Sequence, residues 1–75
     1  MRSFQAHIYL EENDSKQLIC CSLMIECRTE AQLQNNITKV IQDFANLKEY
    51  HFKSYRMEEY KDGRVEEYNA KVSQL

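Results

Sequence analysis

The sequence predicts a small α+β fold in which one amphipathic helix, residues 29–46, packs on an antiparallel sheet, in the order ββαββ. Three observations predict this class: an alternating apolar pattern at residues 4–11, a helical repeat from residue 29, and a hairpin-type Asp62-Gly63 dipeptide. A chain of 75 residues with one glycine, no proline and no repeat is expected to form a single α+β domain over residues 1–75.

The first two strands are expected to pair as a hairpin. Residues 4–11 alternate between apolar and mainly polar side chains, which is the period of a half-buried strand. The polar run at residues 12–16 is typical of a loop. A second strand, from about Gln17 to Arg28, has an inward set and an outward set that are both fairly apolar, so we expect a central strand. The inward set is Ile19, Cys21, Leu23, Ile25 and Cys27; the outward set is Leu18, Cys20, Ser22, Met24 and Glu26.

The period changes at Thr29 from two to 3.6 residues. Thr29 is the expected N-cap, with Gln32 reaching back to the backbone N–H of Thr29 as in a capping box. Asn46 fits a left-handed position that ends the helix. The expected apolar stripe consists of Leu33, Ile37, Val40, Ile41 and Phe44.

A second hairpin is expected around Asp62-Gly63. This register places Met57 opposite Tyr68 and Tyr55 opposite Ala70. It requires a bulge or a strand break near Lys53 or Ser54 to bring Tyr50 and Phe52 onto the same face. A second helix from about Val65 to Leu75 is the alternative, because Val65, Tyr68 and Val72 also have helical spacing.

Composition argues against several functions. A net charge of −2 disfavours a general nucleic-acid binder. No apolar run is long enough to cross a membrane, and no export signal is recognisable, so a cytoplasmic location is expected. The three cysteines do not form a disulfide framework or a zinc motif. No family signature surrounds a nucleophile, so we expect no enzyme, no catalytic residue, no metal site and no cofactor.

Two surfaces are candidates for binding. One helix covers only part of a four-stranded sheet, so the outward side chains need a partner or a second copy of the chain. An acidic hairpin could also bind the basic groove of a nucleic-acid-handling enzyme, or it could only improve solubility. The predicted protein-binding residues are Tyr9, Met24, Tyr60, Glu58, Glu59, Asp62, Glu66 and Glu67.

The favoured interpretation is a non-enzymatic protein-binding module, a small regulator or inhibitor of a larger protein that also forms a homodimer. Its size is compatible with accessory proteins of phages and mobile elements. The alternative is a single-stranded nucleic-acid-binding protein, because basic and aromatic residues interleave within residues 48–56. The residues of that alternative are Lys48, Tyr50, Phe52, Lys53, Tyr55 and Arg56.

Overall fold

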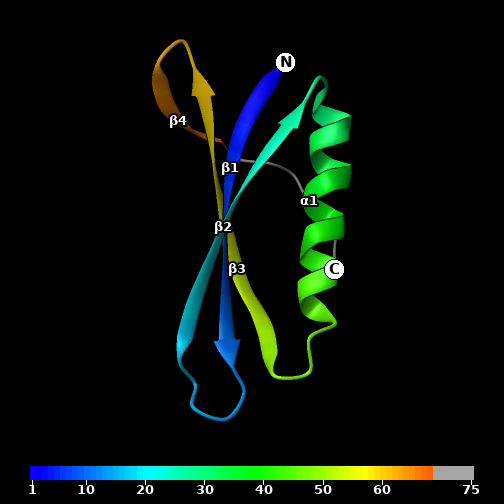
Figure 1. Ribbon diagram of the computed structural model, residues 1–75, viewed down its shortest axis with the longest axis vertical. Helices are drawn as coiled ribbons and strands as arrows, with labels where there is room; N and C mark the ends of the chain where they lie inside the picture. Colours follow the sequence, from blue (N-terminus) through cyan, green and yellow to red (C-terminus); the bar gives the residue numbers. More distant parts are fainter. Residues whose placement is uncertain (69–75) are drawn as a thin grey trace.

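The computed structural model describes residues 1–68. The elements are β1 (Arg2–Glu12), β2 (Leu18–Cys27), α1 (Glu30–Ala45), β3 (Tyr50–Lys61) and β4 (Arg64–Tyr68), as Figure 1 shows. The four strands form one sheet in the order β2-β1-β3-β4, and each neighbouring pair is antiparallel. The predicted fold class and the order ββαββ are therefore confirmed.

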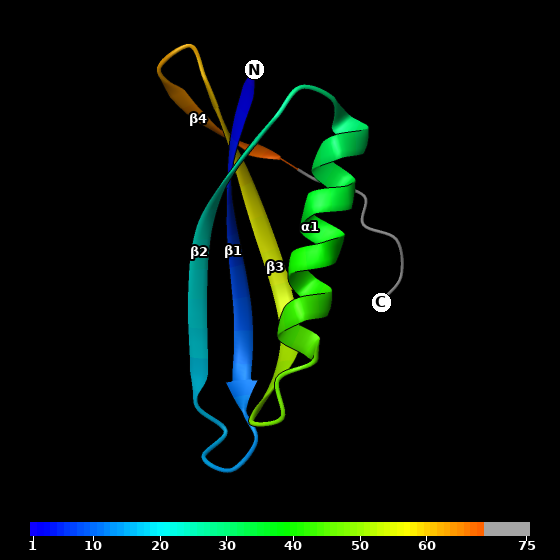
Figure 2. The ribbon, with the colours of Figure 1, turned by 45° about the vertical axis from the view of Figure 1, so that its right-hand side comes forward.

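The molecule has two layers. Helix α1 lies along one face of the sheet, and the strands run beside it in both ribbon views (Figures 1 and 2). The hydrophobic core fills the space between the two layers, because alternate residues of β1 point toward the apolar stripe of the helix. The buried core side chains are Phe4, Ala6, Ile8, Leu10, Ile25, Cys27, Leu33, Ile37, Ile41 and Met57.

Strand β2 corrects one prediction. Its inward set faces the helix as expected, with Ile25 and Cys27 buried, but β2 lies at the edge of the sheet and is not central. The reason is that β3 returns from the helix to the far side of β1, so β1 has neighbours on both sides. The apolar outward residues of β2 are therefore left at the surface, with Leu18 62% and Met24 53% exposed.

The helix begins as predicted and ends differently. The hydroxyl of Thr29 accepts the N–H of Gln32, which confirms Thr29 as the N-cap. The Gln32 side chain accepts the N–H of Arg28 at 2.8 Å, one residue before the predicted donor. Asn46 has φ −82° and ψ −5°, so the left-handed C-terminal position was wrong. The helix instead ends in a right-handed turn, in which the N–H of Leu47 bonds to the carbonyl of Phe44 at 3.1 Å.

The second hairpin has the predicted register. Asp62 and Gly63 both have positive φ, 51° and 75°, as a two-residue hairpin turn requires, and Met57 lies opposite Tyr68. The predicted pairing of Tyr55 with Ala70 lies outside the described residues. Residues 65–68 belong to β4, which contradicts a helix beginning at Val65.

The predicted bulge in β3 is confirmed. Tyr9 lies opposite Ser54, whereas the next residue, Leu10, lies opposite Phe52, so Lys53 is the extra residue of β3. This shift returns Tyr50 and Phe52 to the helix side, where both pack against the core. The bulge therefore places Tyr50 and Phe52 on the same side of the sheet as Tyr55 and Met57, which lie beyond it on β3.

Candidate protein-binding face

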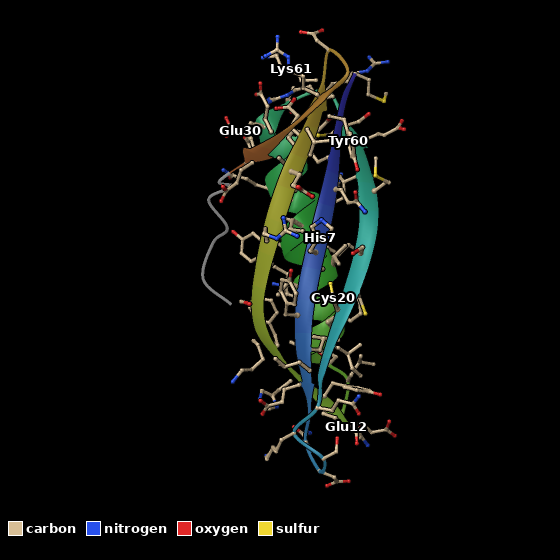
Figure 3. The ribbon with its side chains drawn as sticks, turned by 90° about the vertical axis from the view of Figure 1, so that its left-hand side faces the viewer. His7, Glu12, Cys20, Glu30, Tyr60 and Lys61 are labelled. Atoms are coloured by element: carbon tan, nitrogen blue, oxygen red, sulfur yellow. The ribbon has the colours of Figure 1, made fainter. Side chains whose placement is uncertain are left out.

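The side of the sheet turned away from α1 carries no covering layer among the described residues. We call it the outer face; Figure 3 looks onto it, with the helix behind the sheet and His7, Cys20 and Tyr60 in view. Strand register assigns its members, because directly paired residues point to the same side. They include Ser3, Gln5, His7, Tyr9, Glu11, Leu18, Cys20, Ser22, Met24, Glu26, Ser54, Arg56, Glu58, Tyr60, Val65 and Glu67.

His7 occupies the middle of the outer face. Its Nδ1 lies 2.8 Å from the hydroxyl of Ser22 on β2, and its Nε2 lies 2.7 Å from Oε1 of Glu58 on β3. The thiol of Cys20 lies 3.8 Å from the same hydroxyl. Because these side chains come from three neighbouring strands, the imidazole ring links β2, β1 and β3 across the surface.

Two further groups bind to this centre. The Arg56 guanidinium lies 3.4 Å from Oε2 of Glu58, and a hydrogen bond with Tyr9 is the main reason that the pKa of Arg56 is raised. The pKa of Glu58 is lowered, first by its hydrogen bond with His7 and then by the charge of Arg56. The central polar groups of the outer face are therefore connected to one another rather than independently solvated.

Both ends of the outer face carry polar contacts. Glu11 lies 3.2 Å from Nε2 of His51 and 3.7 Å from Nζ of Lys53, next to the bulge. At the other end of the sheet, the hydroxyl of Tyr60 donates to Oε1 of Gln5. These contacts hold the rims of the outer face in defined positions.

Large apolar side chains surround the polar centre. Leu18 and Met24 lie on β2, and Val65 on β4 is 51% exposed. Tyr60 is 41% exposed although its hydroxyl is bonded, so its ring remains accessible. An exposed face that combines accessible apolar groups with ordered polar groups is typical of a protein-binding surface.

A second polar cluster lies on the helix side of the sheet, and sequence reasoning missed it. Arg2 makes two hydrogen bonds to Glu59, at 2.9 and 3.0 Å, and its guanidinium lies over the rings of Phe4 and Tyr68 at 5.0 and 5.6 Å. The hydroxyl of Tyr68 donates to Glu30 in the first turn of α1. This cluster connects β1, β3, β4 and the start of the helix, so its role is structural.

The predicted acidic surface is divided between the two faces. Glu58 and Glu67 lie on the outer face, whereas Glu59 and Glu66 are paired with each other on the helix side. Glu59 is only 8% exposed, and its bond to Arg2 is the main cause of its lowered pKa, so its carboxylate is not part of the exposed acidic surface. Alternation along the strands explains the division, because neighbouring residues point to opposite faces.

The remaining predicted protein-binding residues are accessible or lie on the outer face. Asp62 is in the turn between β3 and β4 and is exposed. Tyr9, Met24 and Tyr60 all belong to the outer face, on three different strands. The structure therefore brings these three side chains onto one surface.

The basic and aromatic residues of the nucleic-acid alternative do not share a surface. Tyr50, Phe52 and Tyr55 pack against the core on the helix side. Arg56 lies on the outer face beside Glu58, and Lys53 lies near Glu11. Lys48 is exposed in the segment between α1 and β3. Stacking of bases next to neutralised phosphates needs both kinds of side chain on one surface, and here they are separated.

The row formed by Ser22, His7 and Glu58 has the hydrogen-bond order of a nucleophile, a base and an acid. Acyl transfer also needs preorganised donors for the developing oxyanion and a cleft that holds the substrate. Two grooves formed by residues 1–68 lie elsewhere, one between β2 and α1 and one beside Arg2 and Lys61. These hydrogen bonds link the strands β2, β1 and β3.

Three further features concern residues 1–68. No group of three or more His, Cys, Asp or Glu side chains in this part of the chain could hold a metal ion. The helix described there is too short and too polar to span a membrane. The cysteines differ in position: Cys20 is exposed on the outer face, Cys21 is half-buried and Cys27 is buried in the core.

Comparison with known proteins adds no family. No protein-family model, no curated protein and no solved structure matches this chain. The fold defines a small α+β protein in which one helix packs on one face of a four-stranded antiparallel sheet.

Proposed function

We propose that this chain is a non-enzymatic protein-binding module that acts in the cytoplasm as a small regulator or inhibitor of a larger protein, and that it also forms a homodimer. The observation that carries the proposal is the outer face. It presents Met24, Tyr60 and Val65 around an ordered polar centre, and α1 covers only the opposite side of the sheet.

The chemistry of the outer face favours a protein as its ligand. Tyrosine and methionine are enriched at protein interfaces, where an apolar body is buried while polar groups at the rim keep their hydrogen bonds. Tyr60 fits this pattern, because its hydroxyl bonds to Gln5 and its ring remains accessible. Hydrogen bonding also restrains the rotamer of Tyr60, which lowers the entropic cost of binding.

The charge of the outer face indicates the kind of partner. Four carboxylates lie on it: Glu11, Glu26, Glu58 and Glu67. Within residues 1–68, basic side chains pair with Glu11 and Glu58, and no ion pair is found for Glu26 or Glu67. A partner with basic groups opposite β2 and β4 would complement this distribution. A basic nucleic-acid-handling enzyme is one such partner.

The experiment is affinity capture from the native cell with three forms of the full chain. Wild type is compared with Tyr60→Arg on the outer face and with Asn35→Arg on the exposed face of α1. We expect wild type and Asn35→Arg to capture the same protein and Tyr60→Arg to lose it. The Asn35 variant matches the added charge at a position away from the sheet.

Equal capture by all three forms would contradict the proposal, as would capture of nucleic acid without protein. Circular dichroism of Tyr60→Arg separates loss of the interface from loss of the fold. If that variant is unfolded, Val65→Arg on β4 replaces it, because Val65 is exposed on the same face and has no described polar contact to lose.

A further inference from the structure

Within residues 1–68, strand β2 has a backbone edge that no other strand pairs with. The hairpin shows which residue pairs of β1 and β2 are hydrogen-bonded, because the N–H of Glu12 bonds to the carbonyl of Gln17. Because hydrogen-bonded and non-hydrogen-bonded pairs alternate, the next residue, Leu18, directs its own N–H and C=O away from β1. Every second residue of β2 therefore directs its backbone N–H and C=O away from β1; these residues are Leu18, Cys20, Ser22, Met24 and Glu26.

The other sheet edge differs from this one. Strand β4 has five described residues, and Arg64, Glu66 and Glu67 give it charges of both signs. Strand β2 has ten residues with no proline, lysine or arginine, and Glu26 is its one charged side chain. Lysine, proline and short length are the usual features that prevent edge strands from pairing, and β2 has none of them.

A groove runs beside the free edge. It has a volume of about 400 Å³ and lies between β2 and α1. Leu23 and Val40 are half-buried in its wall, and Lys39 and Asp43 lie on the helix side of it. Its lining includes Met24 as well, whose side chain belongs to the outer face, so the groove opens along the edge itself.

We infer that β2 pairs antiparallel with β2 of a second copy of this chain, forming a continuous eight-stranded sheet. This inference rests on the self-association included in the proposed function and assigns it a surface. The two-fold axis passes next to Met24, so Met24 lies opposite Met24 of the second copy and Ser22 lies opposite Glu26 of that copy. Both helices then lie on one side of the joined sheet, and both outer faces lie on the other.

The charges beside the groove favour a second copy over an unrelated strand. Lys39 and Asp43 are one turn apart on α1, at the level of Leu23 to Glu26. A two-fold axis makes the two helices antiparallel, so Lys39 of each copy faces Asp43 of the other. Because each copy places its lysine opposite the aspartate of the other copy, the charges of this surface are complementary to those of a second copy.

The spacing of the two helices permits these ion pairs. Helix α1 contacts β2 and β3, which flank β1, so it lies above β1. Three strand spacings would therefore separate the two helices, a distance of about 14 Å between their axes. This leaves room for one layer of side chains, in which the long lysine side chain reaches a carboxylate on the opposite helix.

The pairing would cover the exposed side chain of Met24. It is 53% exposed in the single chain, and opposite side chains in an antiparallel pair lie close enough to touch. The two Met24 side chains would cover each other at the centre of the joined outer face. Tyr60 lies two strands away on β3, so the pairing leaves it free for another protein.

The first test is the dimer dissociation constant, measured by sedimentation equilibrium under reducing conditions. Wild type is compared with Lys39→Asp, Asp43→Lys and the double variant Lys39→Asp/Asp43→Lys. Each single reversal places like charges opposite each other twice and should weaken the dimer about tenfold. The double reversal restores both pairs with exchanged signs, and its dissociation constant should return to the wild-type value.

The second test is disulfide formation under mild oxidation, in a Cys20→Ser/Cys21→Ser background. Met24→Cys should form a covalent dimer, because a directly opposed hydrogen-bonded pair has Cα atoms about 5.5 Å apart, within the range of a disulfide. Asn35→Cys, exposed on α1, is the control for random collision and should remain a monomer.

A wild-type chain that stays monomeric at the highest soluble concentration would overturn the inference, as would a dimer that both single reversals leave unchanged. A monomer whose β2 amides become protected only when another protein is bound would assign the edge to that protein instead. The Tyr60→Arg variant keeps the two proposals apart, because it should lose the captured protein and retain the dimer.

Discussion

Nε2 of His7 lies 2.7 Å from Oε1 of Glu58, on the face of the sheet that the helix leaves uncovered. The pair spans β1 and β3, residues that are 51 positions apart in the sequence. Together with the bond from Nδ1 of His7 to Ser22, it makes the outer face an ordered surface rather than a set of independently solvated side chains.

The pair predicts acid sensitivity. Glu58 has a pKa below its ordinary value of 4.5, so its contribution to stability is fully present above that pH and is lost as the pH falls through the lower value of the folded state. The difference in unfolding free energy between wild type and Glu58→Gln should therefore be larger above pH 4.5 than in acid. Urea unfolding over a pH series measures it, and a difference that is unchanged in acid would contradict the assignment.

The Arg2–Glu59 pair is expected to stabilise the fold. Glu59→Gln removes a carboxylate that accepts two hydrogen bonds from Arg2, and it should lower the free energy of unfolding by about 1 kcal/mol, since Arg2 is partly exposed to solvent. Glu66→Gln is the matched control, because Glu66 lies directly opposite on β4 and is exposed. Equal losses in the two variants would refute a specific role of the pair.

The helix stripe should be sensitive to loss of volume. Ile37 is fully buried, so Ile37→Ala should cost about 2–5 kcal/mol through lost burial and the cavity left behind. Asn35→Ala, at an exposed position of the same helix, should be neutral or slightly stabilising, because alanine has the higher helix propensity. Thermal or chemical unfolding of both variants checks the difference, and an Ile37→Ala variant as stable as wild type would contradict the assigned core.

The β3–β4 turn should depend on backbone conformation alone. Gly63 has φ +75°, and a Cβ atom at this position would meet nothing within 4 Å. Gly63→Ala should therefore cost about 1 kcal/mol through the positive φ and not through a clash. Gly63→Asn should cost less, because asparagine tolerates this region better. Chemical unfolding of the two variants measures the difference, and equal stability of both with wild type would argue against the turn.

Local signals in the sequence were sufficient for the elements. Thr29 as a helix cap, the Asp62-Gly63 turn and the bulge near Lys53 were each predicted from a few neighbouring residues, because capping, positive φ and strand alternation are local properties. The order of the strands in the sheet could not be predicted from local signals. The edge position of β2 depends on which side of β1 the chain returns to after the helix, and no short segment contains that information.

The residues of the candidate site were also predictable only where a local signal determines their position. Tyr9 and Met24 were predicted as surface residues from their outward positions in the strands, and Tyr60 was included as an aromatic residue outside the core. The links from His7 to Ser22 and Glu58 depend on register across three strands, so they were missed. Glu59 was predicted as part of an acidic surface because its neighbours in sequence are acidic, although alternation turns it toward Arg2.

The most direct test of the proposed function is photo-crosslinking in the native cell, with a photoreactive amino acid replacing Tyr60 on the outer face or Asn35 on the exposed side of α1. A protein that binds the outer face should be crosslinked at position 60 and not at position 35. Crosslinking to the same protein at position 35, or crosslinking at position 60 to nucleic acid alone, would contradict a protein-binding role for the outer face.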